Sequence, residues 1–403
     1  MSSDARSFAA LRQPRFRTYF VGASLAMMAD SIEHVISYWI IFQKFQSPAL
    51  GGFAVLSHWL PFLLFSVYSG ALADRFDPRR IIQIGMGVFM AVSLGWGLFF
   101  LTDSLEMWHA MVLLLLHGFA GVLWSPAQQL LIHEIVDEAD VPSAVRLMAT
   151  SRWLGLLMGP AVGGVILLAM GPTWGILFNV LIYVPMVIWV ARMPYQHKAA
   201  PPPLRGLSDI VTTARAISGS RILLSMILLA GGTSLLVGNA YQAQMPEFAH
   251  DLGHSHADLN YSMLLGADAA GAFVAGLVLE SRGLLPPRAR SAFILAMLWC
   301  VVVGSFAVVT SYPLALALLF VAGFLELSFN AMAQTLVQTN APAAIRGRVI
   351  GLYAMSALGM RTFSGITVGL GGSLVGIHWS LALSAGALFV LLSVGMLFAA
   401  RSR

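Results

Sequence analysis

Residues 70–80 read GALADRFDPRR, and this stretch decides the fold. Long apolar runs flank it at 50–73 and 81–101, each close to the roughly 20 residues that a membrane-spanning helix needs. The stretch itself holds three arginines and two aspartates, so we expect a short polar turn between two spans. Lys and Arg are enriched in the cytoplasmic loops of membrane proteins, which predicts that this turn lies on the inner side.

The composition extends this interpretation to the whole chain. Of 403 residues, 58% are hydrophobic and only 10% are charged, whereas average globular proteins have about 25% charged residues. Such a chain cannot cover a water-exposed surface with charge, which excludes intrinsic disorder, a disulfide scaffold and a soluble α/β enzyme. The runs are continuously apolar rather than alternating, so an outer-membrane barrel is disfavoured. We therefore expect an all-α integral membrane protein.

Twelve apolar runs follow one another along the chain. We expect membrane spans at 16–43, 50–73, 81–101, 108–131, 143–169, 172–192, 221–246, 258–281, 289–310, 312–337, 347–376 and 379–400. The first run is too long for the core of a signal peptide and has no small-residue cleavage site near its end, so we expect it to be retained.

The basic residues test this topology. With the N-terminus in the cytoplasm, 20 of the 23 Lys and Arg residues fall in inside segments. Lys44 falls outside, and Arg152 and Arg361 fall within spans. This asymmetry follows the positive-inside rule and predicts a multi-pass protein of the bacterial inner membrane with both termini in the cytoplasm. The net charge of +5 then reflects these loops, and we expect no nucleic-acid partner.

One long loop divides the chain into two halves. It covers 194–219 and contains three consecutive prolines, Pro201, Pro202 and Pro203. We expect an N-terminal six-helix bundle at 1–193, a cytoplasmic linker at 194–219 and a C-terminal six-helix bundle at 220–403. The halves match weakly, since Gly70 to Asp74 corresponds to Gly276 to Glu280. Two parallel six-helix repeats are typical of transporters with a site between the halves at mid-membrane.

The stretch at 70–80 resembles the G-x-L-x-D-R-x-x-x-R-R signature of the major facilitator superfamily, and departs from the common pattern at Asp77 and Pro78. The resemblance implies the major facilitator fold with 12 transmembrane helices. It also implies a conformational latch between inward-open and outward-open states, formed by Gly70, Asp74, Arg75, Arg79 and Arg80. The alternative is that the three arginines only anchor the topology.

A second motif lies in the fifth span. Gly155, Gly159, Pro160, Gly163 and Gly164 fit G-x-x-x-G-P-x-x-G-G, which resembles the motif of superfamily exporters that work as antiporters. Small residues at four-residue spacing let a neighbouring backbone approach closely, so a plain packing face is the alternative. Asp30, Ser125-Pro126-Ala127 and Arg346-Gly347-Arg348-Val349 also resemble the branch that contains enterobactin exporters and macrolide efflux proteins. Fold-level similarity does not identify the cargo.

Charged side chains inside spans indicate where the mechanism lies, because each costs about 2.5–3.5 kcal/mol at the bilayer centre. Asp30, Glu33 and His34 share one face of the first span at i, i+3 and i+4. Two buried carboxylates one turn apart repel each other, so we expect one of them to hold a proton near neutral pH. We predict a proton-coupling site here. A structural network with Arg152 or Arg361 is the alternative.

Polar residues in other spans predict the cargo site. We expect substrate or cavity contacts from Tyr38, Asn239, Gln242, Asp268, Glu326, Asn330 and Arg361. Arg361 is a plausible salt-bridge partner for Glu326 or Asp268, so a charge-balanced structural bridge stays open. Aromatic residues near span ends are also common as interface anchors.

We expect no metal site, no cofactor and no enzymatic activity. His250, His254 and His256 crowd one outer loop but match no strong ligand motif, and we expect His58 and His117 to be satisfied interior histidines. The chain has one cysteine, Cys300, and no phosphate-binding glycine-rich loop followed by Lys and Ser or Thr. The expected energy source is therefore a proton gradient.

Together these features predict a secondary active transporter. We expect a proton-coupled antiporter that exports an amphipathic small molecule, siderophore-like or drug-like, by alternating access. Its expected partners are the cargo, protons and membrane lipid, and we expect a monomer. A lipid or lysolipid transporter or an importer of the same fold is the alternative. A non-transporting sensor or a metal transporter is less favoured.

Overall fold

The computed structural model describes residues 8–45, 47–194, 208–238, 240–243, 245–253, 257–282, 286–364 and 371–400. These residues are almost entirely helical and include no strand. Nine helical segments among them are long and apolar enough to cross a membrane. The all-α membrane fold is thus confirmed. The count of twelve spans stays a prediction, because the segments at 143–169, 221–246 and 347–376 are not among the nine.

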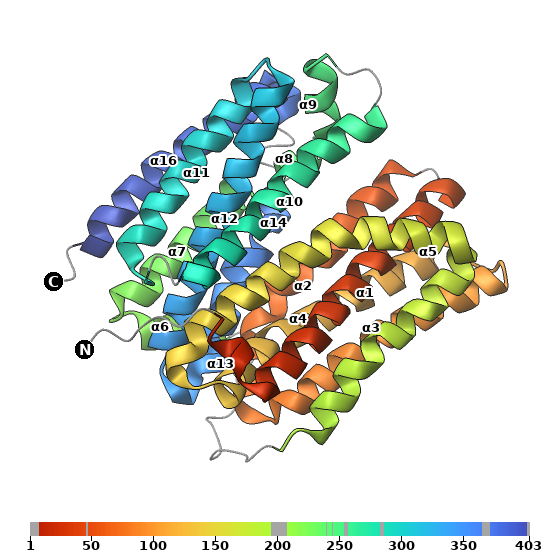
Figure 1. The fold of residues 1–403 in the computed structure, drawn as a ribbon, viewed down its shortest axis with the longest axis horizontal. Coiled ribbons are helices and arrows are strands. Elements are labelled where there is room, and N and C mark those ends of the chain that lie inside the picture. Colours follow the sequence, from red (N-terminus) through yellow and green to blue (C-terminus); the bar gives the residue numbers. More distant parts are fainter. Residues whose placement is uncertain are drawn as a thin grey trace.

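Five long helices form the first half and pack side by side (Figure 1). They are α1 (Pro14–Phe45), α2 (Pro48–Arg75), α3 (Pro78–Leu101), α4 (Met107–Ile135) and α5 (Val141–Arg192), with single turns η1 (Ala10–Arg12) and η2 (Glu138–Asp140) before α1 and α5. The long α5 has two arms that meet at Gly171, where φ is 70° and ψ is 172°. Glycine adopts this conformation without steric penalty, so the chain turns back between the predicted spans at 143–169 and 172–192.

The second half contains more and shorter helices. After α6 (Ser208–Ile217) come α7 (Arg221–Leu236), α8 (Ala240–Ala243), α9 (Met245–Asp251), α10 (Ala257–Arg282), α11 (Ala289–Val308), α12 (Tyr312–Asn340), α13 (Arg346–Ala354), α14 (Arg361–Ser364), α15 (Gly371–Val375) and α16 (Ile377–Ala400). The turn η3 (Ala343–Ile345) precedes α13, and the π-helical turn η4 (Met355–Gly359) follows it.

Two of the predicted spans are interrupted. The span expected at 221–246 stops being one helix after Leu236, and Gly238 follows with φ of 50°. The span expected at 347–376 is broken by the π-helical turn η4. The two breaks adjoin, because a Cβ placed on Gly238 would lie 2.6 Å from the side chain of Ser364. Irregular backbone at membrane depth is tolerated where protein buries it or where it lines a cavity.

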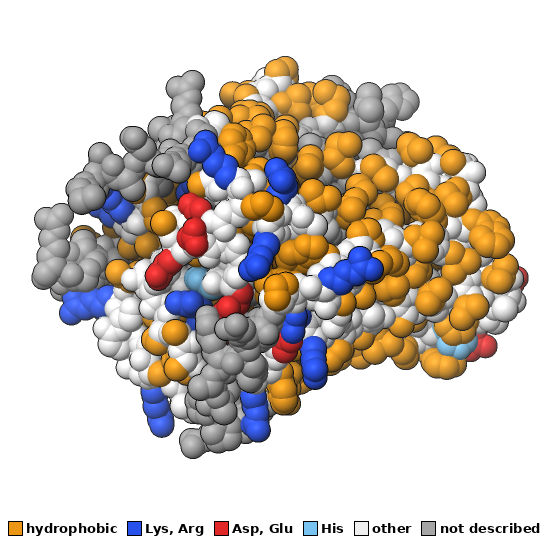
Figure 2. Space-filling model, turned by 60° about the horizontal axis from the view of Figure 1, so that its bottom comes forward, with side chains coloured by type: hydrophobic (Ala, Val, Ile, Leu, Met, Phe, Trp, Pro, Cys, Tyr) orange, Lys and Arg blue, Asp and Glu red, His pale blue; other side chains and the backbone are white. Residues whose placement is uncertain are grey.

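The surface separates into an apolar flank and a charged end. Figure 2 shows hydrophobic side chains spread over the flank, while Lys and Arg gather toward one end. Many large apolar side chains are exposed, and Leu168 and Leu374 reach 89% and 84%. Exposure of so many apolar residues is favourable in lipid but not in water. We name the charged end the arginine-rich end; it comprises the C-terminal ends of α2 and α10 and the N-terminal ends of α3, α5, α11 and α13.

Each half has its own main core, the two halves meet along two seams, and Phe62 and Val67 of α2 also pack against residues of the second half. Phe16, Tyr19 and Phe89 belong to the core of the first half, and Phe293 and Trp299 to that of the second. The first seam joins α2 to α13, η4 and α14; the second joins α5 to α10 and α12. Polar residues that face the interior near these seams are therefore positioned by both halves.

Candidate transport site

A buried polar cluster lies inside the first half. Asp30, Glu33 and His34 come from α1, as the sequence predicted, and His58 of α2 and His117 of α4 join them. Glu33 is 2% exposed and His117 is 5% exposed. The side chains of Asp30 and His34 are 18% and 23% exposed, so the cluster is buried at Glu33 and His117 and partly accessible at Asp30 and His34.

His117 connects the two carboxylates. Its Nε2 lies 2.9 Å from Oδ1 of Asp30, and its Nδ1 lies 2.8 Å from Oε1 of Glu33. Ser93 of α3 donates a short hydrogen bond to the other oxygen of Glu33, and Asn179 of α5 donates to the carbonyl oxygen of Ala29 at 3.0 Å. With carboxylate oxygens at both nitrogens, the ring is favourably placed as an imidazolium between two anions.

His34 and His58 extend the cluster. His34 Nδ1 lies 2.8 Å from the carbonyl oxygen of Asp30, and His34 Nε2 lies 3.3 Å from Nδ1 of His58. The rings of His34 and His117 are 4.6 Å apart, and the ring of Tyr38 lies 5.1 Å from that of His34. The sequence predicted that His58 and His117 are interior residues. It did not predict that they contact Asp30, Glu33 and His34 on α1. Their separation in sequence hides this contact.

The alternative to a proton-coupling site, a network of these carboxylates with Arg152 or Arg361, is not seen among the described residues. Among the described residues, the basic group within 4.0 Å of Asp30 and of Glu33 is histidine rather than Arg152 or Arg361. Arg152 nevertheless interacts electrostatically with Asp30 of its own half and with Glu326 of the other half. Its charge therefore acts on polar groups of both halves.

A second polar cluster lies inside the second half. Asp268 of α10 is 1% exposed and Glu326 of α12 is 6% exposed. The hydroxyl of Tyr241 lies 3.5 Å from both oxygens of Asp268 and 3.4 Å from Oε2 of Glu326. Gln242 donates to Asp268 at 3.0 Å, and Asn330 donates to the backbone carbonyl of Glu326 at 3.0 Å. Four predicted cavity residues thus meet here, and Tyr241 joins them.

Arg361 does not form the salt bridge expected for it. Among the described residues, its guanidinium has no carboxylate within 4.0 Å, although it interacts electrostatically with Glu326. Its central carbon lies 5.1 Å from the ring centre of Trp59, which belongs to α2. The side chain therefore reaches across the first seam to an aromatic face in the other half.

The predicted latch residues hold the first seam at the arginine-rich end. The carboxylate of Asp74 accepts hydrogen bonds from the backbone N–H groups of Gly347 and Arg348, at 2.6 and 2.9 Å. It thereby caps the first turn of α13, where unpaired N–H groups favour an anion. A Cβ on Gly70 would overlap the carbonyl oxygen of Gly347, so the two backbones touch.

The arginines of the latch have separate local partners. Arg79 pairs with Asp77 at 2.7 Å and donates to the carbonyl oxygen of Met193. Arg75 lies over the ring of Phe76 at 5.7 Å, and Arg80 is exposed. Asp77 and Pro78, where the sequence departs from the common pattern, form the N-cap and first residue of α3. The unusual pair thus supplies a helix start.

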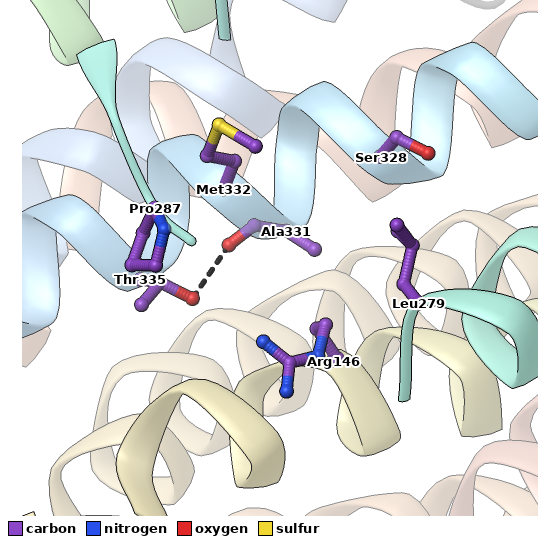
Figure 3. Close-up of a pocket in the computed structure, with 7 residues that line it drawn as sticks. All are labelled: Arg146, Leu279, Pro287, Ser328, Ala331, Met332 and Thr335. Carbon is purple, nitrogen blue, oxygen red and sulfur yellow. Dashed lines mark hydrogen bonds between the residues drawn. The ribbon is translucent and has the colours of Figure 1, made fainter. Parts of the chain in front are cut away.

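The second seam has a matching carboxylate at the same end. Glu280, at the end of α10, accepts hydrogen bonds from Ser143 and, at 2.7 Å, from Nε of Arg146. Figure 3 shows Arg146 of α5 beside a pocket whose other walls come from α10, α12 and the segment before α11. This pocket is lined by Arg146, Leu279, Pro287, Ser328, Ala331, Met332 and Thr335. Both halves build its walls, so the pocket changes shape if the seam opens.

Comparison with known proteins settles the family. Residues 5–402 match the family of transmembrane secretion effectors, which lies within the major facilitator superfamily. The chain belongs to this family. The enterobactin exporter EntS of Shigella boydii serotype 4 is 24% identical over 396 residues, which cover 95% of this chain and 91% of that protein. The predicted family and its transporter role are thus confirmed.

Solved structures agree on the fold. The human organic anion transporter MFSD10 aligns with a TM-score of 0.74 and 13% identity, over 95% of this chain and 99% of that one. The E. coli fucose:proton symporter FucP aligns with a TM-score of 0.73 and 13% identity, over 98% and 99%. This confirms the predicted major facilitator fold. With its membrane spans and bacterial exporter relatives, the secretion effector is a multi-pass protein of the inner membrane.

The glycine motif of this secretion effector packs α5 against α1. A Cβ on Gly159 would overlap the side chain of Ser31, and one on Gly163 would lie 3.1 Å from Val35. Gly155 faces Met27 at 3.3 Å, whereas a Cβ on Gly164 would meet nothing within 4 Å. Three of the four predicted glycines therefore form the close contact. The side chain of Pro160 lies outside the described part of the structure.

Three histidines of the first half lie close enough together to be considered as ligands of one metal ion. One ligand atom from each of His34, His58 and His117 lies within 4.8 Å of the others. However, both nitrogens of His117 face carboxylates, and His34 contacts a carbonyl oxygen and His58. Rings engaged in this way favour shared protons over metal ligation. That the chain has no metal site stays a prediction.

The predicted outer-loop histidines are only partly described. His250 lies 3.1 Å from Oδ1 of Asp251, and His378 of α16 lies 3.0 Å from Oδ2. These hydrogen bonds from His250 and then His378 hold the pKa of the Asp251 carboxyl below its ordinary value. His254, His256 and the predicted cavity residue Asn239 lie outside the described residues.

Proposed function

We propose that this secretion effector is a proton-driven antiporter that exports an amphipathic small molecule. Asp30, Glu33 and His34 exchange protons as predicted, with His117 as a fourth member of the site. The arginine-rich end faces the cytoplasm, with both termini on that side. Tyr38, Gln242, Glu326 and Arg361 contribute to the cargo cavity between the halves.

The observation that carries the proposal is the arrangement Asp30–His117–Glu33. Two carboxylates lie 2.9 and 2.8 Å from the two nitrogens of one buried imidazole. Protonated His117 offsets only one of the two negative charges, and a second proton neutralises the set. Burying an uncompensated charge is costly, so proton binding changes which state of the site is stable. The cluster of Asp30, His117 and Glu33 can therefore couple proton binding to a change of conformation.

The seams indicate which state of the cycle this is. Asp74 and Glu280 hold the halves together at the arginine-rich end. With that end in the cytoplasm, the protein faces outward, where cargo leaves and protons enter. In the proposed cycle, protons from outside neutralise the Asp30 cluster and the seams then open. The protons leave to the cytoplasm as new cargo binds.

For the cargo we propose a siderophore-like or drug-like molecule. A relative that spans nearly the whole chain bears the name enterobactin exporter. The cavity side chains combine aromatic faces with amide and charged groups, which suits a ligand with both apolar and polar parts. Lipid transport is the competing function, and the same assay distinguishes it.

The test uses inside-out membrane vesicles that generate an acidic interior. Enterobactin, a macrolide and a lysophospholipid are supplied outside the vesicles, each with and without a protonophore. We expect gradient-dependent accumulation of enterobactin or the macrolide, and its loss in Asp30→Asn. Glu138→Gln, at an exposed site in η2, is the control and keeps accumulation. Accumulation that persists in Asp30→Asn or with the protonophore would refute proton coupling. Movement of lysophospholipid alone would favour the lipid function.

A further inference from the structure

Four contacts follow one another along the first seam, and the contact between Arg361 and Trp59 is the farthest of the four from the arginine-rich end. Moving outward from the arginine-rich end, Asp74 meets Gly347 and Ser66 meets Gly351. A Cβ on Gly359 would lie 2.5 Å from Leu63, and Arg361 then lies 5.1 Å from the Trp59 ring. The last contact thus depends on a cation over an indole face rather than on backbone packing.

Arg361 has few other attachments. Its Nε is buried and has no hydrogen-bond partner among the described residues. The π-helical turn Met355–Gly359 ends two residues before it, and such turns often mark functional sites. The attraction between a guanidinium and a Trp ring is weak when the pair is exposed to water and stronger when it is desolvated. This contact is therefore weak enough to be switched by one nearby charge.

Trp59 also touches the proton site. Its ring centre lies 4.5 Å from that of His58, the preceding residue, and the rings stand edge to face. His58 lies 3.3 Å from His34, whose ring is 4.6 Å from that of His117. A continuous series of contacts thus leads from the Asp30 cluster through His58 and Trp59 to Arg361 in the other half.

A proton on His58 changes the last contact in this series. Groups that act on His58 are Asp30 and His34 of α1, His117 of α4 and Arg152 of α5. Arg361 of α14 contacts the same Trp59 ring as His58. An imidazolium at 4.5 Å competes with Arg361 for the same electron-rich ring and repels both arginines. Proton binding therefore weakens the first seam at this contact.

We propose that Trp59 and Arg361 are positioning residues that transmit proton binding at the histidines of the first half to the second half. This inference rests on the proposed proton coupling at the Asp30 cluster. A proton that enters from outside and binds His58 places positive charge beside Trp59, Arg361 leaves the ring, and the first seam opens from this contact. Export then requires no direct contact between the proton and the cargo.

The test measures the opening of the arginine-rich end as a function of pH. In a Cys300→Ser background, spin labels at Glu138→Cys and Arg290→Cys, both exposed, report the distance between the halves. The pH is lowered from about 8 to about 4, which extends below the ordinary titration of imidazole because burial disfavours the charged form of the ring. We expect this step to shift the unsubstituted labelled protein toward the longer distance.

The variants separate the roles of charge and ring. Trp59→Leu and Arg361→Gln are expected to abolish the pH-dependent shift, and His58→Gln to abolish it as well. Trp59→Phe and Arg361→Lys keep a ring and a cation, so they are expected to retain a reduced shift. Rescue by the conservative variants excludes a merely structural loss. Gel filtration checks that each variant is folded.

The outcomes distinguish this inference from the proposed function. If the shift persists unchanged in Trp59→Leu and Arg361→Gln while Asp30→Asn abolishes it, proton coupling stands and the route through Trp59 is wrong. If the unsubstituted protein shows no shift with pH, both are overturned. The route from His58 through Trp59 to Arg361 is supported if two results are obtained. Trp59→Leu, Arg361→Gln and His58→Gln each abolish the shift, and Trp59→Phe and Arg361→Lys retain part of it.

Discussion

His117 is the residue on which the charges of the first half depend. It faces Asp30 and Glu33 with its two nitrogens, and its side chain is almost completely buried. Removing one partner of a buried ion pair is more damaging than removing both, because the remaining charges have no counter-ion. If His117 is replaced, Asp30 and Glu33 lose their counter-ion. They are then expected to bind protons, because buried negative charges without a partner are unfavourable.

We predict that His117→Gln destabilises the protein by about 3–5 kcal/mol at neutral pH, the usual cost of breaking a buried ion pair. The cost should fall as the pH is lowered, because the carboxylates then become neutral. Thermal unfolding in detergent at several pH values measures both effects. His250→Gln, 78% exposed at the opposite end, is the control and should leave the melting temperature nearly unchanged. An equal loss of stability at all pH values would contradict the charge argument.

At the residue scale, the sequence predicted the members of the cluster on α1 but not the histidine of α4 that binds them. Asp30, Glu33 and His34 were readable because helical spacing places them on one face. His117 lies 84 residues from Glu33, and no local pattern links them. The alternative of an arginine partner was consistent with charge, but Arg361 extends to Trp59 instead. Only the packing of α1 against α4 determines which cation reaches the carboxylates.

At the level of elements, the glycine motif of α5 explains why α1 and α5 lie so close. Gly159 and Gly163 face Ser31 and Val35, while Gly164 faces open space. Small residues at four-residue spacing let helices approach in membranes, and only glycines on the contact face matter. The motif therefore contains positions with different tolerance to a methyl group.

We predict opposite effects for two alanine substitutions in this motif. Gly159→Ala places a methyl group into Ser31 and should cost about 1–3 kcal/mol by overpacking. Gly164→Ala meets nothing within 4 Å and should gain up to about 1 kcal/mol from reduced chain entropy. Paired melting temperatures of the two variants measure the difference. Equal destabilisation by both would mean that the glycines act through something other than contact with α1.

The helix breaks mark the limit of prediction at this scale. Both 221–246 and 347–376 are mainly apolar despite a few polar residues such as Gln242 and Arg361, so hydropathy predicted one helix in each range. The structure instead has a left-handed Gly238 and the π-helical turn Met355–Gly359. Both distortions arise where α7 and α14 adjoin, as the contact of Gly238 with Ser364 shows. Tertiary packing, which the apolar pattern does not encode, decides where a long helix breaks.

For the whole molecule, the two seams close one end by related means. Asp74 ends α2 and caps α13, while Glu280 ends α10 and binds Ser143 and Arg146 of α5. Each carboxylate lies at the end of a helix in one half and bonds to a helix start in the other. The weak internal repeat seen in the sequence, Gly70 to Asp74 against Gly276 to Glu280, thus corresponds to two carboxylates that join the halves at one end.

We predict that Asp74→Asn and Glu280→Gln each favour opening of the arginine-rich end. Loss of a helix cap costs about 0.5–2 kcal/mol, and loss of hydrogen bonds to a charged group costs about 1.5–3 kcal/mol. The two sites lie on different seams and share no partner, so the costs should add in the double variant. The sum, about 2–5 kcal/mol, changes the closed-to-open ratio by a factor of ten or more, since about 1.4 kcal/mol is tenfold.

The spin-label distance between positions 138 and 290 measures this ratio directly. Because opening separates the halves along both seams at once, each single variant should raise the open population and the double variant should raise it further. Asp251→Asn, in the outer cluster with His250 and His378, is the matched carboxylate control and should leave the ratio unchanged. If Asp74→Asn alone gives the full effect and Glu280→Gln gives none, only the first seam acts as the gate. The second carboxylate then serves packing within an already fixed interface, and the resemblance between the halves has no mechanical counterpart.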